Sequence, residues 1–110
     1  MSEWVVVLCT VGRQADADRI AGELVERRLA ACVSVTPNVL STYRWKGAVE
    51  KESELLLFIK TRADRFEALR EAIVGLHPYQ VPEILALPVT TGHPPYLAWL
   101  DESVSVTEAG

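Results

Sequence analysis

Four side chains in this sequence are of the types that bind soft or borderline metal ions: Cys9, Cys32, His77 and His93. Thiolates and imidazoles are the ligands that copper and zinc prefer. The four residues are scattered, and the chain contains neither a Cys-x-x-Cys nor a His-x-x-x-His pair. The sequence therefore predicts no closed structural zinc site. His93 lies beside a glycine and a proline in an expected loop, which favours a solvated surface imidazole.

His77 belongs to the most distinctive stretch of the chain, residues 76–88, in which three prolines alternate with polar and aromatic residues. Pro78 moves His77 away from helical dihedral angles, so the preceding helix must end there. Pro82 can begin a strand but cannot lie inside a central one. Stiff corners between elements often position binding groups. On residue types alone we nevertheless favour a rigid connector with a hydrogen-bonded imidazole, since such polar groups are often structural.

Two aromatic and two ionisable residues are further candidates. Tyr43 and Trp45 could stack on a small ligand or anchor an interface between subunits, and we favour anchors because aromatic residues are enriched at interfaces. Lys60 and Glu83 are expected near strand ends, beside apolar runs. They suit either a partly buried ion pair at a subunit junction or a pair of groups that holds a ligand in an intersubunit cleft. The residue types leave both open, since a buried charge needs some partner.

At 110 residues the chain is expected to be one domain, residues 1–110, with too little apolar surface at residues 103–110 for that tail to dock firmly. The 15 acidic and 11 basic residues give a net charge of −4. This balance argues against a nucleic-acid binder and against an anionic membrane surface. No segment has transmembrane length, and the first apolar run is too short for a signal sequence. We expect a cytoplasmic protein in which Cys9 and Cys32 are reduced.

The hydrophobic pattern predicts four strands and three helices. The strands are expected at residues 4–10, 31–45, 48–61 and 84–89, and the helices at about residues 16–29, 64–76 and 96–102. Pro37 is expected to mark a bulge inside the second strand. Lys46 and Gly47 are a tight-turn signal, which makes the second and third strands one long hairpin that projects beyond the sheet. Asp64 with Glu67 fits a capping box for the second helix.

This element order predicts an α+β fold of the ferredoxin-like β-α-β-β-α-β type, followed by a short C-terminal helix. The strands of such a sheet are ordered fourth, first, third, second. Cys9 and Cys32 then lie on strands separated by a third strand, about 9–10 Å apart or more. A disulfide requires Cα atoms within about 7 Å. Both cysteines are therefore expected to be small buried hydrophobic residues.

Two helices can cover only one face of this sheet. Residues 5–8 and 55–59 are nevertheless apolar at every position, so their strands are apolar on both faces. A monomer would leave a large apolar patch in water, which soluble proteins rarely tolerate. The pattern therefore predicts an oligomer whose interface is the open face of the sheet.

Five short motifs, in this order along the chain, resemble the divalent-cation-tolerance (CutA) family. They are Ala30-Ala31-Cys32-Val33, Tyr43-Arg44-Trp45-Lys46-Gly47, Leu57-Phe58-Ile59-Lys60-Thr61, His77-Pro78-Tyr79-Gln80-Val81-Pro82-Glu83 and Tyr96-Leu97-Ala98-Trp99-Leu100. The resemblance covers about residues 5–100. It implies a ferredoxin-like protomer in a tight homotrimer, similar in architecture to PII-type signalling trimers. It also implies a link to metal tolerance, mainly copper, through binding of divalent cations. Fold similarity supplies no catalytic activity.

The resemblance singles out Cys32 and His77 as metal ligands, because both lie in its motifs. The extra cysteine or histidine that some members carry late in the second helix is absent from residues 72–76. Two functions follow. The first is a trimer that binds copper or another divalent cation in cation homeostasis. The second is a PII-like signalling or scaffold trimer whose clefts bind a small metabolite or a partner, with metal incidental. No organic cofactor is implied, and an enzyme is least favoured because no nucleophile–base pair is evident.

Overall fold

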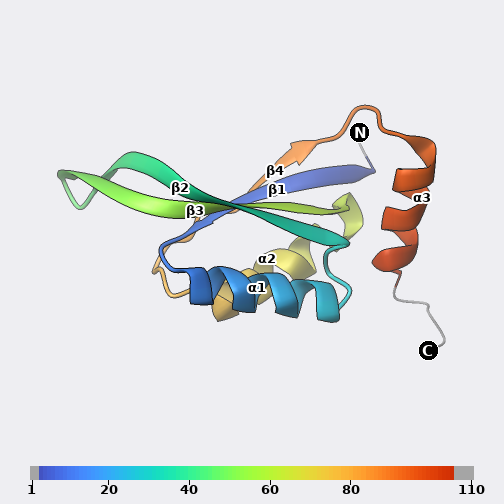
Figure 1. Cartoon of the computed structure of the whole chain (residues 1–110), viewed down its shortest axis with the longest axis horizontal. Helices are drawn as coiled ribbons and strands as arrows, with labels where there is room; N and C mark the ends of the chain where they lie inside the picture. Colours follow the sequence, from blue (N-terminus) through green and yellow to red (C-terminus); the bar gives the residue numbers. More distant parts are fainter. Residues whose placement is uncertain (1–2, 106–110) are drawn as a thin grey trace.

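The computed structural model describes residues 3–105, which form a four-stranded antiparallel sheet with helices against one face and one end (Figure 1). The strands are β1 (Trp4–Val11), β2 (Cys32–Trp45), β3 (Ala48–Arg62) and β4 (Leu85–Pro88). The helices are α1 (Gln14–Glu26), α2 (Phe66–Leu76), which follows a 3-10 turn at Ala63–Arg65, and α3 (Pro94–Ser103). The sheet order is β2-β3-β1-β4, and every neighbouring pair is antiparallel. All predicted elements are present, and the strand order agrees with the prediction.

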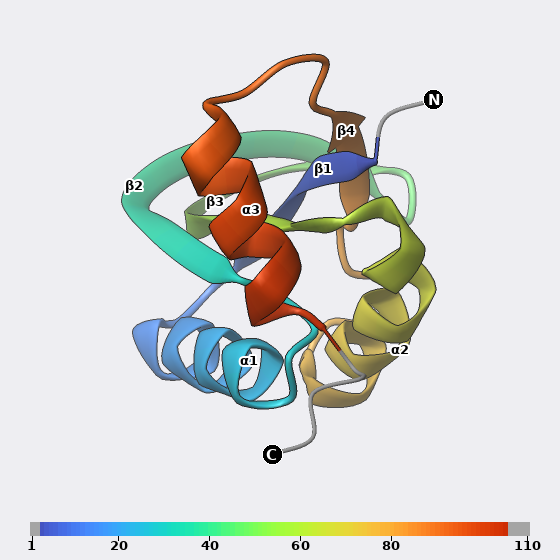
Figure 2. The ribbon, with the colours of Figure 1, turned by 90° about the vertical axis from the view of Figure 1, so that its right-hand side faces the viewer.

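The two faces of the sheet differ in burial. Alternate residues of β1 and β3 point toward α1 and α2, and the buried side chains include Val5, Val7, Cys9, Leu57 and Ile59. The helices contribute Ile20, Leu24, Leu69 and Ile73 to the same core. Figure 2 shows α1 and α2 side by side beneath the sheet. On the other face Val6 and Phe58 are only partly buried, because no helix of residues 3–105 covers them. Within one chain, the apolar run of β1 is therefore fully buried on one face only.

The β2–β3 hairpin extends well beyond the other strands, as Figure 1 shows. The last residue of β1, Val11, pairs with Leu55, so the first half of β3 pairs with β2 alone. The register of β2 shifts between Thr36 and Val39, next to Asn38 at φ 63°. The predicted bulge is confirmed there. The predicted projecting hairpin is confirmed too.

The predicted capping box of α2 is wrong. The N-cap residue is Arg65, and no side chain caps the helix. The reason is the preceding 3-10 turn, which moves the helix start past Asp64. The Asp64 carboxylate instead accepts hydrogen bonds of 3.3 and 3.4 Å from Nε of Arg62. Glu67 pairs within the helix with Arg70.

The C-terminal helix α3 crosses the end of the sheet opposite the hairpin (Figure 1). Its Asp101 carboxylate accepts hydrogen bonds from Nη1 of Arg62 (2.6 Å) and Nε1 of Trp4 (2.9 Å). Val104 is 1% exposed and packs with Leu100. The expectation of a weakly docked tail from residue 103 onward is therefore wrong for Val104, while residues 106–110 lie outside the described part of the chain.

The hairpin turn requires left-handed backbone at both of its central residues. Lys46 has φ 50° and Gly47 has φ 83°, the pattern of a type I′ turn. Gly47→Ala is expected to lower the free energy of unfolding by about 1–2 kcal/mol, because a Cβ is disfavoured in this conformation.

Gly22→Ala is the matched control for this substitution. A Cβ at Gly22 meets nothing within 4 Å, and Gly22 lies inside helix α1. Alanine there should raise the free energy of unfolding by about 0.5–1 kcal/mol. Equilibrium unfolding in urea measures both variants. Equal effects of the two substitutions would contradict the left-handed turn.

Candidate functional site

A groove of about 820 Å³ lies between the β2–β3 hairpin and the loop that follows α2. The hairpin provides the rings of Tyr43 and Trp45 and the carboxylates of Glu52 and Glu54, and the loop provides Tyr79 and Glu83. None of the described residues that line the groove is basic. Three of the four predicted ligand-binding residues, Tyr43, Trp45 and Glu83, are therefore brought together, and Lys60 is not.

Strand alternation explains why the hairpin wall is both acidic and aromatic. Residues two apart on a strand share a face, so Glu50, Glu52 and Glu54 point to the same side of β3. Across the hairpin, Tyr43 pairs with Glu50 and Ser41 pairs with Glu52. This face of the hairpin thus presents a row of carboxylates beside aromatic rings.

A hydrogen bond joins the two walls of the groove. The Tyr79 hydroxyl donates to Oε2 of Glu54 at 2.7 Å, and Glu54 is only 6% exposed. Partial burial, the hydrogen bond to Glu54 and the charge of that carboxylate raise the pKa of Tyr79. Desolvation and then the charges of Glu52, Glu50 and Glu54 raise the pKa of Tyr43. Desolvation and then the nearby carboxylates thus both favour the protonated form of these two phenols.

The imidazole of His77 fixes the loop on which Tyr79 lies. Nδ1 accepts a hydrogen bond of 3.1 Å from the backbone N–H of Tyr79, so Nε2 carries the proton and donates it to the carbonyl oxygen of Thr10 at 2.8 Å. The ring is 8% exposed. The interpretation of a hydrogen-bonded structural imidazole is confirmed. Neither ring nitrogen can bind a metal ion unless one of these bonds breaks.

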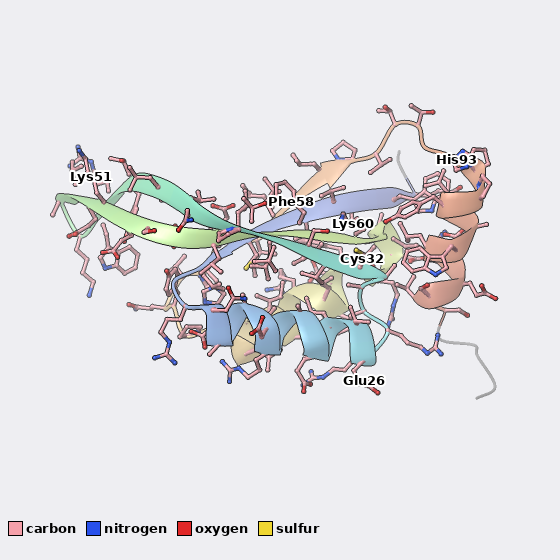
Figure 3. The ribbon with its side chains drawn as sticks, in the orientation of Figure 1. Glu26, Cys32, Lys51, Phe58, Lys60 and His93 are labelled. Atoms are coloured by element: carbon pink, nitrogen blue, oxygen red, sulfur yellow. The ribbon has the colours of Figure 1, made fainter. Side chains whose placement is uncertain are left out.

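Cys32 lies toward the end of the sheet near α3, whereas Lys51 marks the hairpin at the opposite end (Figure 3). Cys32 is half-buried rather than fully buried as predicted, because its position in the alternation places it on the open face. Nζ of Lys60 donates to Oγ of Ser34 at 2.7 Å and lies 3.7 Å from Sγ of Cys32. The structure thus brings Lys60 to Cys32, not to Glu83.

The predicted metal ligands Cys32 and His77 are far apart within one chain. Cys32 pairs with Lys60, whereas Thr10, the partner of His77, pairs with Leu56. These positions on β3 are separated by about 13 Å at the usual rise per residue. Among residues 3–105, no group of three or more His, Cys, Asp or Glu side chains is placed to hold a metal ion.

The other two candidate ligands are placed as the sequence predicted. Cys9 is fully buried in the core. Burial, followed by the charges of Glu83 and Glu54, raises the pKa of its thiol to about 12. Cys9 is therefore a protonated thiol at neutral pH, which is a poor metal ligand. His93 is exposed at the start of α3.

The family model described as "CutA1 divalent ion tolerance protein" matches residues 5–103 of the sequence. The chain belongs to the CutA family. It is 51% identical over 98 residues to the divalent-cation tolerance protein CutA of Thermus thermophilus, and the match covers 89% of this chain and 95% of that protein. It is 47% identical over 95 residues to protein CutA of Mus musculus, and this match covers 86% of the chain but 54% of the mouse protein. The family predicted from the motifs is thus confirmed.

Solved structures of CutA proteins have the same fold. The divalent cation tolerance protein of Thermus thermophilus superposes with a TM-score of 0.90 at 49% identity, over 93% of this chain and 99% of that one. CutA of Xylella fastidiosa superposes with a TM-score of 0.92 at 38% identity, over 94% of this chain and 100% of that one. A CutA protein of Archaeoglobus fulgidus, described as periplasmic, superposes with a TM-score of 0.90 at 34% identity, over 93% of this chain and 99% of that one. Within residues 3–105, no helix is long and apolar enough to cross a bilayer.

Sequence reasoning missed most of the acidic wall. It gave no role to Glu52, Glu54 or Tyr79. The signal was present in the alternation of glutamates at every second position opposite Tyr43. No sequence pattern indicates that residues 79–83 fold back against this face of the hairpin.

Tyr79→Phe is expected to reduce the loss of stability at alkaline pH. The folded chain holds the pKa of Tyr79 above its unfolded value, which is about 10. The interaction therefore stabilises the fold fully below about pH 10 and is lost as the pH rises toward the folded pKa. The free energy of unfolding in urea should fall more steeply between about pH 9 and 11 in the native protein than in the variant. Identical slopes would contradict the role given to the phenol.

Proposed function

We propose that the protein is a homotrimer that binds divalent cations, copper in particular, and acts in cation tolerance in the cytoplasm. In this proposal the protomer is ferredoxin-like and the trimer has the architecture of PII-type proteins. Membership of the CutA family supports the link to divalent cations. The main observation in support of the trimer is the open apolar face of the sheet.

The open apolar face is formed by residues of β1, β3 and β4 that point away from α1 and α2. It consists of Val6, Leu8, Leu56, Phe58, Leu85 and Leu87, which the strand register places next to one another. Leu85 and Leu87 are 56% and 49% exposed in the single chain. Contiguous apolar surface of this kind marks an interface. We infer that the sheets of neighbouring subunits cover it.

A closed ring of three also protects the edges of the sheet. β2 is an edge strand along its whole length, and β4 at the other edge has only four residues. Unpaired edges invite uncontrolled association. A hairpin that pairs with the short edge of the next subunit would protect β4 and part of β2. Closed symmetry is the usual solution for soluble homo-oligomers.

For copper we propose Cys32 as the ligand that each chain contributes. Its half-buried thiol lies on the open face beside Lys60, and copper prefers sulfur ligands of this kind. One chain offers no complete set of ligands within residues 3–105, so the remaining ligands would come from neighbouring subunits. His77 joins them only if it gives up a hydrogen bond to Thr10 or Tyr79. A reduced thiol is the cytoplasmic state of cysteine.

The groove supports the second function, a PII-like signalling or scaffold trimer that binds a small metabolite or a partner. Its volume is in the usual range for small-molecule sites. We propose binding rather than catalysis there, because the ring nitrogens of His77 are both engaged and Cys9 is a buried, protonated thiol.

Copper binding is tested by calorimetric titration in the presence of a competing chelator whose copper affinity is known. Copper should bind more tightly than magnesium or calcium, because thiolate and imidazole are softer than the oxygen ligands those ions prefer. Cys32→Ser should weaken copper binding by about tenfold or more, whereas Cys9→Ala is the matched control and should leave it unchanged. Weaker copper binding in His77→Ala would show that the imidazole is also a copper ligand. Unchanged copper affinity in a variant that lacks both Cys32 and His77 would refute these ligands.

A further inference from the structure

The geometry of the groove points to a ligand that the cation-tolerance function does not specify. We propose that the groove binds an elongated organic polycation of the polyamine class. The inference rests on the second function proposed above, to which it adds a class of ligand. It is independent of copper binding, because Cys32 pairs with Lys60, about 20 Å along β3 from Glu54 at the usual rise per residue.

The first observation is uncompensated negative charge. Glu52, Glu54 and Glu83 all line the groove, and no described lining residue is basic. Among residues 3–105, neither Glu52 nor Glu83 has an ion-pair or hydrogen-bond partner for its carboxylate. Glu54 accepts the hydroxyl of Tyr79, a neutral donor. A cation that enters the groove would therefore meet carboxylates and no basic residue in the described lining.

The second observation argues against a single small metal ion held by one chain as that cation. A divalent ion requires oxygen ligands within about 2.0–2.6 Å, and no three acidic, histidine or cysteine side chains of the described chain converge in this way. Glu52 and Glu54 are two residues apart on one face of β3, about 7 Å along the strand. Such a spacing suits two ammonium groups joined by a short methylene chain.

The third observation is the aromatic lining. Tyr43 and Trp45 are 41% and 38% exposed and stand on the hairpin wall, with Tyr79 on the facing loop. Aromatic faces attract ammonium groups and also pack against methylene chains. The ring of Trp45 already has such a group near it, because Nζ of Lys46 lies 5.7 Å from its centroid. The side chain of Val81 adds apolar surface.

Together these features match the alternation of charge and hydrocarbon in a polyamine. The ammonium groups of the ligand would meet Glu52 and Glu54 while its methylene chain packs between the rings of Tyr43 and Tyr79. The same charges disfavour nucleotides, phosphorylated metabolites and carboxylic acids. A PII-like role for this chain would therefore depend on a cationic metabolite rather than an anionic one.

Calorimetric titration of the native assembled protein with spermidine tests the proposal. We expect saturable binding that weakens as salt is raised, because ion pairing contributes to it. Glu52→Gln should lower the affinity about tenfold, since it removes one charge-assisted contact. Glu52 is exposed on the hairpin, so this variant is expected to fold normally. Trp45→Ala should lower the affinity as well, without changing the circular dichroism spectrum.

Glu26→Gln is the matched control. Glu26 is an exposed glutamate on α1 and points away from the sheet (Figure 3), so the substitution removes the same charge outside the groove and should leave spermidine binding unchanged. Magnesium at the same concentration as spermidine should not displace it.

Three results would overturn the polyamine proposal: no binding of spermidine, equal affinity in Glu52→Gln and Glu26→Gln, or displacement by equimolar magnesium. A neutral or anionic metabolite that binds in place of spermidine and loses affinity in Trp45→Ala would leave the second function standing and refute only the polyamine class. Loss of copper binding alone would leave this proposal unaffected.

Discussion

Apolar surface on the second face of the sheet is the constraint on which the account of this CutA protein depends. Helices α1 and α2 bury one face, where Val7 and Ile59 are fully inaccessible. The opposite residues of the same strands, such as Val6 and Phe58, are also apolar but remain partly exposed in the single chain. Burial of apolar surface is worth about 25 cal/mol per Å². The strands that form the core therefore also carry exposed apolar residues whose burial strongly favours association.

The groove depends on a second constraint, the stiff corner that follows α2. His77 is tied to Thr10 through one ring nitrogen and to the backbone of Tyr79 through the other. Pro78 ends the helix at this point. The corner therefore positions the hydroxyl of Tyr79 to donate a hydrogen bond to Glu54 on β3. His77, which resembles a metal ligand in the sequence, supports one wall of the groove in the structure.

Much of the fold could be predicted because its signals are local. Two residues specify the hairpin turn, Lys46 and Gly47, and their backbone has the left-handed conformation that the turn requires. The bulge beside Pro37 and the end of α2 before Pro78 follow in the same way from the restricted dihedral angles of proline. Strand order followed from the element order, which few sheet topologies satisfy.

The failures have two causes: local backbone geometry that residue types do not reveal, and contacts between distant segments. Asp64 has the composition of a helix cap but is bonded to Arg62, because a 3-10 turn displaces the helix start. Val104 is buried because α3 is held to the sheet by Asp101, which no local pattern indicates. Cys32 was expected in the core, and its alternation places it on the open face beside Lys60.

Light scattering of the native protein at micromolar concentration tests the central claim most directly. The account predicts about 37 kDa, three times the 12.2 kDa of one chain. Phe58→Glu, which places a charge on the open apolar face, should lower this mass. Val74→Glu, which places the same charge on an exposed site of α2, should not. A folded native protein of about 12 kDa at this concentration would contradict the account.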